Sequence, residues 1–339
     1  MNILVDLAKK LGIIPAPQVD TVSSVMRARA IIEANRLGVF EALADGPLRA
    51  EEVASRRGLS PDGTHALLTA LVACDYLTER DGRYANGWWV RKWILDTGMG
   101  LGHFLGVQEN VWDRASTLGE CVRTGRPVRN PHEALGAEAQ REAEVYVRGM
   151  KQIAQLLIPH LARAVTPPPG ASRVLDLGGS HGDYARALVR RHPGMRATVL
   201  DLAGVVAAAE QISRQRGDTP QVEFRAGNLL TDDLGTGWDG VLMISVLHVF
   251  NPEQARQIFK KVAMALAPGG VFVVLDHLRG VSRGRDSVVA LMGLNWLTLG
   301  GRSYSLDEVK GLMAEAGFSR SSVQKLPFQV GATVVTGSR

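Results

Sequence analysis

Three glycines that directly follow an apolar run constrain this 339-residue chain more than any other feature. Residues 172–177 read as a strand with an apolar core at Val174, Leu175 and Leu177. Gly178, Gly179 and Gly182 follow within five positions, and residues 183–192 place apolar side chains at helical spacing. Glycines at a strand-to-helix turn let the backbone bend tightly and let a ligand approach amides that a Cβ atom would cover. The stretch therefore predicts a strand, a tight turn and a helix, with a ligand lying against the turn.

An acid at the end of the next apolar run narrows the kind of ligand. Residues 197–201 read as a second strand, and it ends in Asp201, 23 residues after Gly178, where a carboxylate could accept both hydroxyls of a ribose. The glycine spacing does not match the dinucleotide pattern G-x-G-x-x-G, so the sequence favours a nucleoside without a diphosphate. A plain turn with a capping Asp201 remains the alternative interpretation.

Further apolar runs alternate with amphipathic segments after the proline cluster at residues 166–170. Strands are expected at residues 221–225, 240–245 and 270–276, and each is followed by or ends in polar side chains. Alternating strands and helices predict an α/β fold with a doubly wound, Rossmann-like parallel sheet, which binds ligands at the carboxyl ends of its strands. The predicted domains are residues 1–165, mostly helical, and residues 166–339, the sheet domain.

The first part of the chain reads as helices followed by a hairpin. Residues 1–11 have helical spacing, residues 22–44 read as two helices divided at Gly38, and residues 48–58 and 61–74 read as short helices. Asp81-Gly82 predicts the turn of a hairpin within residues 76–84. This order is that of a winged helix, and two longer helices are expected at residues 101–125 and 138–164.

Composition limits the partners and compartments. The net charge is +5, but acids and bases are interspersed, and the helix at residues 61–74 that would enter a DNA groove has no Arg or Lys. Cys74 and Cys121 lack metal-ligand spacing, and no apolar run reaches the length of a membrane span, about 18 residues. We therefore expect a cytoplasmic protein with no metal site that binds neither nucleic acid nor membrane, with a dimerisation or packing role for the winged helix.

Several sequence words together resemble a known family. These words are LDLGGSHG (175–182), VLDLAGVV (199–206), FRAGNLL (224–230), DGVLMISVLHVF (239–250), APGGVFVVLDH (267–277) and LGGRSYSLDEVKGLMAEAGF (299–318). They resemble the class I S-adenosylmethionine-dependent small-molecule O-methyltransferases that carry an N-terminal winged-helix dimerisation domain. The resemblance covers nearly the whole chain and implies a homodimer with S-adenosylmethionine as cofactor.

The resemblance also implies site residues. The cofactor would be held by Gly178, Gly179, Gly182, Asp201, Leu202, Gly227, Asn228, Leu229 and Ser245. His248 falls where the family keeps its general base, and Asp276 falls where it keeps the carboxylate that orients this base. His181 and His277 remain rival candidates for the base.

The segment at residues 290–301 resembles the bacterial branch that acts on polyketides, phenazines, pigments and related ring systems. The resemblance places Met292, Asn295 and Trp296 against the acceptor, and Trp112 is a further candidate for the same pocket. A phenol with a pKa near 10 is a poor nucleophile at neutral pH, whereas histidine, with an ordinary pKa near 6.5, can accept its proton. The sequence predicts O-methylation of an aromatic natural-product intermediate.

Two alternatives stay open. C- or N-methylation on the same scaffold would depend less on His248. A non-catalytic protein that binds the cofactor and regulates or scaffolds is the second alternative, because the chain departs from the family pattern at Asn228, Ile244, Val249 and Ser303.

Overall fold

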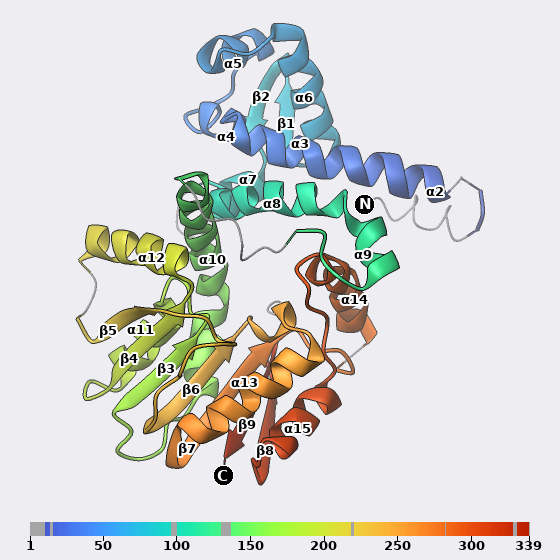
Figure 1. Ribbon diagram of the computed structural model, residues 1–339. Coiled ribbons are helices and arrows are strands. Elements are labelled where there is room, and N and C mark those ends of the chain that lie inside the picture. Colours follow the sequence, from blue (N-terminus) through green and yellow to red (C-terminus); the bar gives the residue numbers. More distant parts are fainter. Residues whose placement is uncertain are drawn as a thin grey trace. The chain divides into compact units, whose positions relative to one another are not determined.

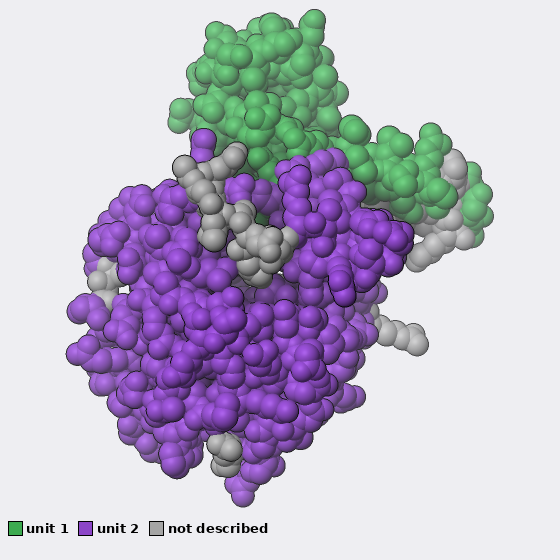
Figure 2. Space-filling model, in the orientation of Figure 1, with its two compact units in different colours: residues 1–109 green, residues 110–339 purple. Residues whose placement is uncertain are grey.

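The protein is described from a computed structural model. The structure describes residues 11–13, 16–95, 100–129, 137–217, 220–281, 283–327 and 331–338. They form two compact units, Met1–Glu109 and Asn110–Arg339, which Figure 2 colours separately. The helix expected at residues 1–11 lies almost wholly outside the described residues.

The first unit consists of short helices and one hairpin. Its elements are α2 (Ala16–Gln18), η1 (Val19–Ser23), α3 (Ser24–Arg36), α4 (Val39–Ala42), α5 (Ala50–Arg57), α6 (Pro61–Ala73), β1 (Leu77–Arg80), β2 (Arg83–Asn86), α7 (Trp88–Trp93) and the start of α8 (Gly102–Ala115). The predicted breaks are confirmed. Gly38 has a φ of +71° between α3 and α4, Ser60 caps α6, and Asp81 and Gly82 have φ values of +53° and +72° in the hairpin turn.

The second unit is built on a seven-stranded sheet in the order β5-β4-β3-β6-β7-β9-β8 (Figure 1). Its strands are β3 (Arg173–Leu177), β4 (Arg196–Asp201), β5 (Val222–Ala226), β6 (Trp238–Ile244), β7 (Leu266–Asp276), β8 (Arg320–Lys325) and β9 (Thr333–Ser338). The first five strands are parallel, and β9 runs antiparallel to both β7 and β8. The α/β fold with a mostly parallel sheet is therefore confirmed.

Helices cover both faces of this sheet (Figure 1). The helices of the second unit are the end of α8, α9 (Leu118–Thr124), α10 (Ala137–Ala164), α11 (Asp183–Arg191), α12 (Ala203–Arg216), α13 (Pro252–Ala265), α14 (Arg283–Leu297) and α15 (Leu306–Glu315), with the 3-10 turn η2 (Leu247–Val249). One core packs α10 and α11 on side chains such as Val174 and Leu242, and the other packs α13 and α15 on Leu175 and Val241. Neighbouring residues of one strand thus point to opposite faces, as the two-residue repeat of a strand requires.

The boundary expected at residues 165 and 166 coincides with the end of α10, which stops at Ala164 before the prolines. Because Ala154, Leu157 and Leu161 of α10 belong to a core of the sheet, this helix is part of the second compact unit. The assignment of residues 1–165 to one functional domain stays a prediction.

The single helix expected at residues 101–125 was wrong. The segment forms α8 and α9, separated at Ser116 and Thr117. The Ser116 and Thr117 hydroxyls donate hydrogen bonds to the carbonyls of Asp113 and Arg114, both at 2.7 Å. Such local side-chain bonds compete with helical ones and end the helix.

Strands β8 and β9 were not anticipated. β8 is mostly exposed and carries a polar sequence, so it lacks the apolar run by which the inner strands were recognised. Pairing with β9 decides its conformation. Among the described residues, no helix is long and apolar enough to cross a membrane.

Candidate active site

The carboxyl ends of β3 and β6 lie side by side in the middle of the sheet. After β3 the chain continues to β4 on one side, whereas β6 is followed by β7 on the other side. Open parallel sheets bind ligands at such a switch point, outside the carboxyl ends of the strands. The structure brings the predicted cofactor residues, His248 and Asp276 to this edge.

The glycine turn after β3 is required by the protein's own packing. Gly178 has a φ of +64°, and a Cβ atom there would lie 2.8 Å from Val246 Cγ2. A Cβ on Gly179 would lie 2.5 Å from Asp176 Oδ2, and one on Gly182 would lie 3.1 Å from Phe224. The glycines therefore let the turn pack closely on β4, β5 and the end of β6, whether or not a ligand also approaches it.

Asp201 at the end of β4 is held against this turn. Its carboxylate accepts hydrogen bonds from the Ser180 amide at 2.9 Å and the Leu202 amide at 2.8 Å. Burial raises the pKa of Asp201 to about 6, although these two amides oppose the shift. Ser180 has a φ of +44°, an uncommon conformation for a side-chain-bearing residue, so the backbone bends to reach the carboxylate.

Asp176 is a site residue that the sequence reasoning missed. It lies in β3, is 0 % exposed, and neither carboxylate oxygen has a hydrogen bond of ordinary geometry within the described structure. Burial and then the nearby charge of Asp201 raise the pKa of Asp176 to about 8. The sequence did offer a signal for this residue, an acid within the otherwise apolar stretch VLDL at residues 174–177. Burying a carboxylate without a partner is unfavourable, so an acid in a buried strand indicates a special role.

His181 helps to hold the glycine turn and the start of α11 in place. Its ring is 5 % exposed, and Nδ1 accepts a hydrogen bond from the Asp183 amide at 2.9 Å. Burial lowers the pKa of His181 to about 4, so the ring is neutral at ordinary pH. Arg186 donates to the His181 carbonyl at 2.6 Å and to the Asp183 carboxylate at 2.8 Å. Arg216 also donates to that carboxylate, and the network fixes the start of α11.

The remaining predicted cofactor residues differ in their surroundings. The Gly227 amide donates to the Asp201 carbonyl at 2.9 Å, which ties the end of β5 to β4. Asn228 is exposed, with its side-chain oxygen on the Leu230 amide, whereas the Leu229 side chain is buried in the core. Ser245, directly after β6, has a φ of +56°, a strained conformation of a kind concentrated at functional sites.

His248 lies in η2, four residues beyond Ile244, the last residue of β6, with its ring beside Asp276. Nδ1 lies 2.9 and 3.1 Å from the two Asp276 oxygens, and the His248 amide donates to Oδ2 at 3.2 Å. Asp276 is 1 % exposed. Burial acts to raise the pKa of Asp276, but the adjacent His248 and then His277 outweigh it, and the net shift is downward. Asp276 is thus an ionised carboxylate that orients the imidazole.

Two further contacts hold His248. Trp296 of α14 is 2 % exposed and stacks on the imidazole, with ring centroids 4.4 Å apart and planes at 22°. The Arg302 amide donates to the His248 carbonyl at 2.9 Å, and a Cβ on Gly301 would collide with that carbonyl. His277 has a different environment, with Nδ1 3.2 Å from the Gly331 carbonyl.

The predicted acceptor residues lie on α14 and at the end of α8. Met292, Asn295 and Trp112 are all partly buried. Asn295 Oδ1 lies 3.5 Å from Nη2 of Arg114, a second residue that the sequence reasoning did not single out. Asn295 is the chain neighbour of Trp296, whose ring stacks on His248.

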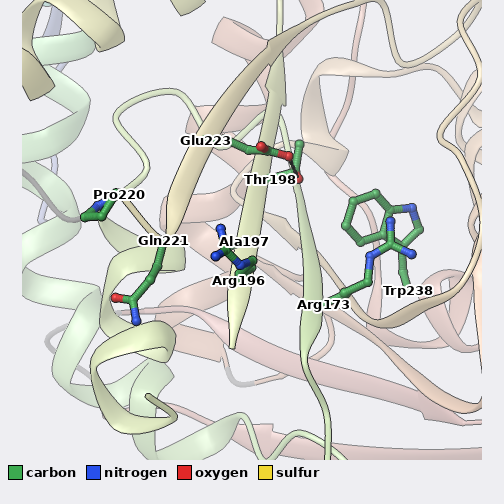
Figure 3. Close-up of a pocket in the computed structure, with 8 residues that line it drawn as sticks. All are labelled: Arg173, Arg196, Ala197, Thr198, Pro220, Gln221, Glu223 and Trp238. Carbon is green, nitrogen blue, oxygen red and sulfur yellow. Dashed lines mark hydrogen bonds between the residues drawn. The ribbon is translucent and has the colours of Figure 1, made fainter. Parts of the chain in front are cut away.

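The other features of the second unit carry no comparable chemistry. The described residues include no group of His, Cys, Asp and Glu suited to a metal ion. A shallow hollow at the opposite edge of the sheet is lined by residues at the beginnings of its strands (Figure 3). There Arg173 lies over the Trp238 ring at 4.5 Å and Thr198 donates to Glu223 at 2.7 Å, so its polar groups are already engaged.

Known proteins share this architecture and sequence. A family model for an O-methyltransferase domain matches residues 116–319, and one for an O-methyltransferase dimerisation domain matches residues 19–89. A Streptomyces sahachiroi protein named 3-hydroxy-5-methyl-1-naphthoate 3-O-methyltransferase is 30% identical over 314 residues, 90% of each chain. The N,N-dimethyltransferase OxyT of Streptomyces rimosus is 28% identical over 316 residues, 88% of this chain and 89% of OxyT.

A solved structure shows the same fold. Human N-acetylserotonin methyltransferase in complex with SAM is 22% identical and superposes with a TM-score of 0.82, covering 94% of this chain and 96% of that one. The domain match spans more than half of the sequence and includes the five parallel strands β3 to β7, the glycine turn and the His248–Asp276 pair. The chain therefore belongs to the O-methyltransferase family of S-adenosylmethionine-dependent methyltransferases.

Proposed function

We propose that this protein transfers a methyl group from S-adenosylmethionine to a hydroxyl of an aromatic natural-product intermediate, with His248 as the general base. The observation that carries the proposal is the His248–Asp276 hydrogen bond at the carboxyl edge of the sheet, beside the turn that holds Asp201. The Streptomyces sahachiroi relative, which is named for 3-O-methylation of a hydroxynaphthoate, supports a hydroxyl on an aromatic ring as the acceptor.

The charges and shapes of the residues present fit the cofactor. Asp201 offers carboxylate oxygens at the end of β4 for ribose hydroxyls, the role this acid has in sheets of this kind. Asp176 and Asp201 leave this part of the site with two buried acids and no basic partner for Asp176 among the described residues. S-adenosylmethionine carries a sulfonium and an ammonium group, so its positive charge complements them. The cofactor supplies the methyl group on an activated sulfur leaving group.

The structure supports a specific role for each member of the His248–Asp276 pair. Because Nδ1 faces the Asp276 carboxylate, it carries the proton, and Nε2 is left to accept a proton from the acceptor hydroxyl. Asp276 stabilises the imidazolium that results, and the stacked Trp296 fixes the plane of the ring. The remaining acceleration comes from holding the two substrates in line.

The acceptor side and the assembly follow the same proposal. Met292 and Asn295 lie on α14, the helix of Trp296, and Trp112 lies on α8, two residues before Arg114, whose guanidinium is 3.5 Å from Asn295 Oδ1. They would provide apolar and amide contacts for a ring system. The dimerisation-domain match supports a homodimer, in which residues 19–89 form the shared surface. The proposal includes a cytoplasmic location.

His248→Ala tests the proposal. We expect this change to lower methyl transfer to a phenolic acceptor at least about 100-fold, because the general base is lost. Affinity for S-adenosylhomocysteine, measured by calorimetry, should be unchanged, because His248 does not hold the cofactor. His277→Ala is the matched control and should retain activity.

The same experiment addresses the alternatives. The OxyT relative is named for N-methylation, a reaction in which an amine can react without a base of this kind. If His248→Ala left turnover near the wild-type value, His248 would have no role as a base and methylation at nitrogen or carbon would become the better proposal. A protein that binds the cofactor but methylates no acceptor of any class would fit the regulatory alternative.

A further inference from the structure

Arg114 lies in the last turn of α8 and is a partly buried cation with no carboxylate within ion-pair distance among the described residues. Its Nε atom is buried and has no hydrogen bond within the described structure, and its guanidinium contacts only the Asn295 amide oxygen, at 3.5 Å. Burial lowers the pKa of Arg114, and the opposing influences of Tyr146 and Asp113 are weaker. Arginine stays charged in proteins, so this is an uncompensated positive charge.

Other arginines of the same unit show what is missing. Buried Arg186 is paired with Asp183 at 2.8 Å, and the half-exposed Arg279 and Arg302 share Glu308 at 3.3 and 2.7 Å. Asp113 is exposed and forms no such ion pair with Arg114. A guanidinium that is taken out of water without an anion is unfavourable, so an anion at this place would complete its hydrogen bonds.

The position of Arg114 indicates which anion it serves. Its amide contact, Asn295, is the neighbour of Trp296 in α14, and Trp296 stacks on His248. The guanidinium therefore lies on the acceptor side of the site, and Asn295 and Trp296 connect it to the stacked imidazole. Asp201 lies at the end of β4, where its carboxylate accepts a hydrogen bond from the Ser180 amide, and Asp176 lies in β3 against Gly179.

We propose that the acceptor is an aromatic compound that bears a carboxylate as well as the hydroxyl, and that Arg114, with Asn295 beside it, binds this carboxylate. The inference rests on the proposed function for the identity of the site. The planar guanidinium matches a carboxylate in two parallel hydrogen bonds, which fixes orientation as well as affinity. Binding the carboxylate at α8 and α14 would direct the ring hydroxyl toward His248.

The test compares three acceptors that share one hydroxyl: 3-hydroxy-1-naphthoic acid, its methyl ester and 2-naphthol. Binding of each to the protein saturated with S-adenosylhomocysteine is measured by calorimetry, so that no turnover is needed. We expect the acid to bind the unmutated protein about 10- to 100-fold more tightly than the two neutral compounds, because a hydrogen-bonded charge pair is formed.

Arg114→Gln should remove this preference, with about a 10- to 100-fold loss for the acid and less than about a threefold change for 2-naphthol. Arg114→Lys keeps the positive charge but lacks the planar guanidinium with its paired N–H donors, so it should retain part of the preference for the acid. Arg123→Gln is the matched control, because Arg123 is exposed and already paired with Glu120. Melting temperature and S-adenosylhomocysteine affinity verify that the variants are folded.

The outcomes separate this inference from the proposed function. Equal binding of acid, ester and 2-naphthol by the unmutated protein, or no binding of any of them at millimolar concentration, overturns the carboxylate site. A preference for the acid that persists in Arg114→Gln also overturns it. A preference that disappears in Arg114→Gln supports it, even if the bound acid is not methylated, in which case the O-methylation proposal fails on its own.

Discussion

At the scale of single residues, the site depends on carboxylates placed in contrasting surroundings. Asp276 is buried beside two histidines, and its pKa is lowered. Burial dominates at Asp176 and Asp201, and it raises their pKa values to about 8 and about 6. A lowered pKa favours the ionised form of Asp276 beside the imidazole, whereas burial favours the neutral form of the other two acids in the ligand-free protein. Three acids of the same sheet edge therefore serve different purposes.

A pH dependence follows from Asp201. Its ionised form accepts hydroxyl hydrogen bonds, and its pKa is raised to about 6 in the ligand-free protein. S-adenosylhomocysteine affinity should be constant above about pH 7 and should weaken by up to about tenfold for each unit below pH 6, as Asp201 becomes protonated. Calorimetric titrations between about pH 5 and about pH 8 measure this affinity on both sides of the raised pKa.

Asp201→Asn serves as the partner variant in that series. It should bind about 10- to 100-fold more weakly at neutral pH, because the charged acceptor is lost, and should show little change with pH. An unmutated protein whose affinity is the same at both ends of the series would show that the ionised carboxylate does not hold the ligand.

At the scale of elements, close backbone packing occurs at two places in the site, the turn between β3 and α11 and the segment that follows α14. Gly179 faces Asp176 and Val199, and Gly301 faces the His248 carbonyl, so two glycines allow backbone segments to approach the two halves of the site closely. The exposed or open glycines of the second unit have no such requirement.

Gly179→Ala should therefore destabilise the protein by about 1–3 kcal/mol, because a Cβ would lie 2.5 Å from Asp176 Oδ2 and 2.9 Å from Val199. Unfolding in urea measures the change in the free energy of unfolding. Gly119→Ala in α9 is the control, since nothing lies within 4 Å of its Cβ and alanine favours a helix. Equal stability of Gly179→Ala and the unmutated protein would contradict the tight packing.

At the scale of the whole molecule, the first unit exposes apolar side chains near its N-terminal end. Val22, Val25 and Met26 are 58%, 42% and 63% exposed, and they lie within the matched dimerisation region. Exposed apolar groups at this spacing share one helix face and are typical of an interface with another chain. The homodimer would bury them.

Met26→Glu should consequently weaken the dimer, because a charge would be buried in an apolar interface. Sedimentation velocity over a range of concentrations should show dissociation at about 10-fold or more higher concentration than for the unmutated protein. Met264→Glu is the control, because Met264 is 70% exposed in α13, outside the dimerisation region. A dimer unchanged by Met26→Glu would place the interface elsewhere.

The sequence by itself determined the parallel sheet, the glycine turn and the hairpin, which have local signals: apolar runs, glycine after a strand, and Asp81-Gly82. The pairing of His248 with Asp276 was implied by the resemblance to a known family. The predicted role of His248 as a base remains to be tested, as do the cofactor and acceptor contacts.

Tertiary structure alone decided the pairing of β8 with β9, the stacking of Trp296 on His248, and the lack of hydrogen-bond partners for Arg114 Nε and the Asp176 carboxylate among the described residues. Each depends on atoms far apart in the chain or on whether a polar group finds a partner after folding. A single sequence shows which side chains are charged, but burial and partners decide which charges need a ligand, because only the folded chain removes water from them.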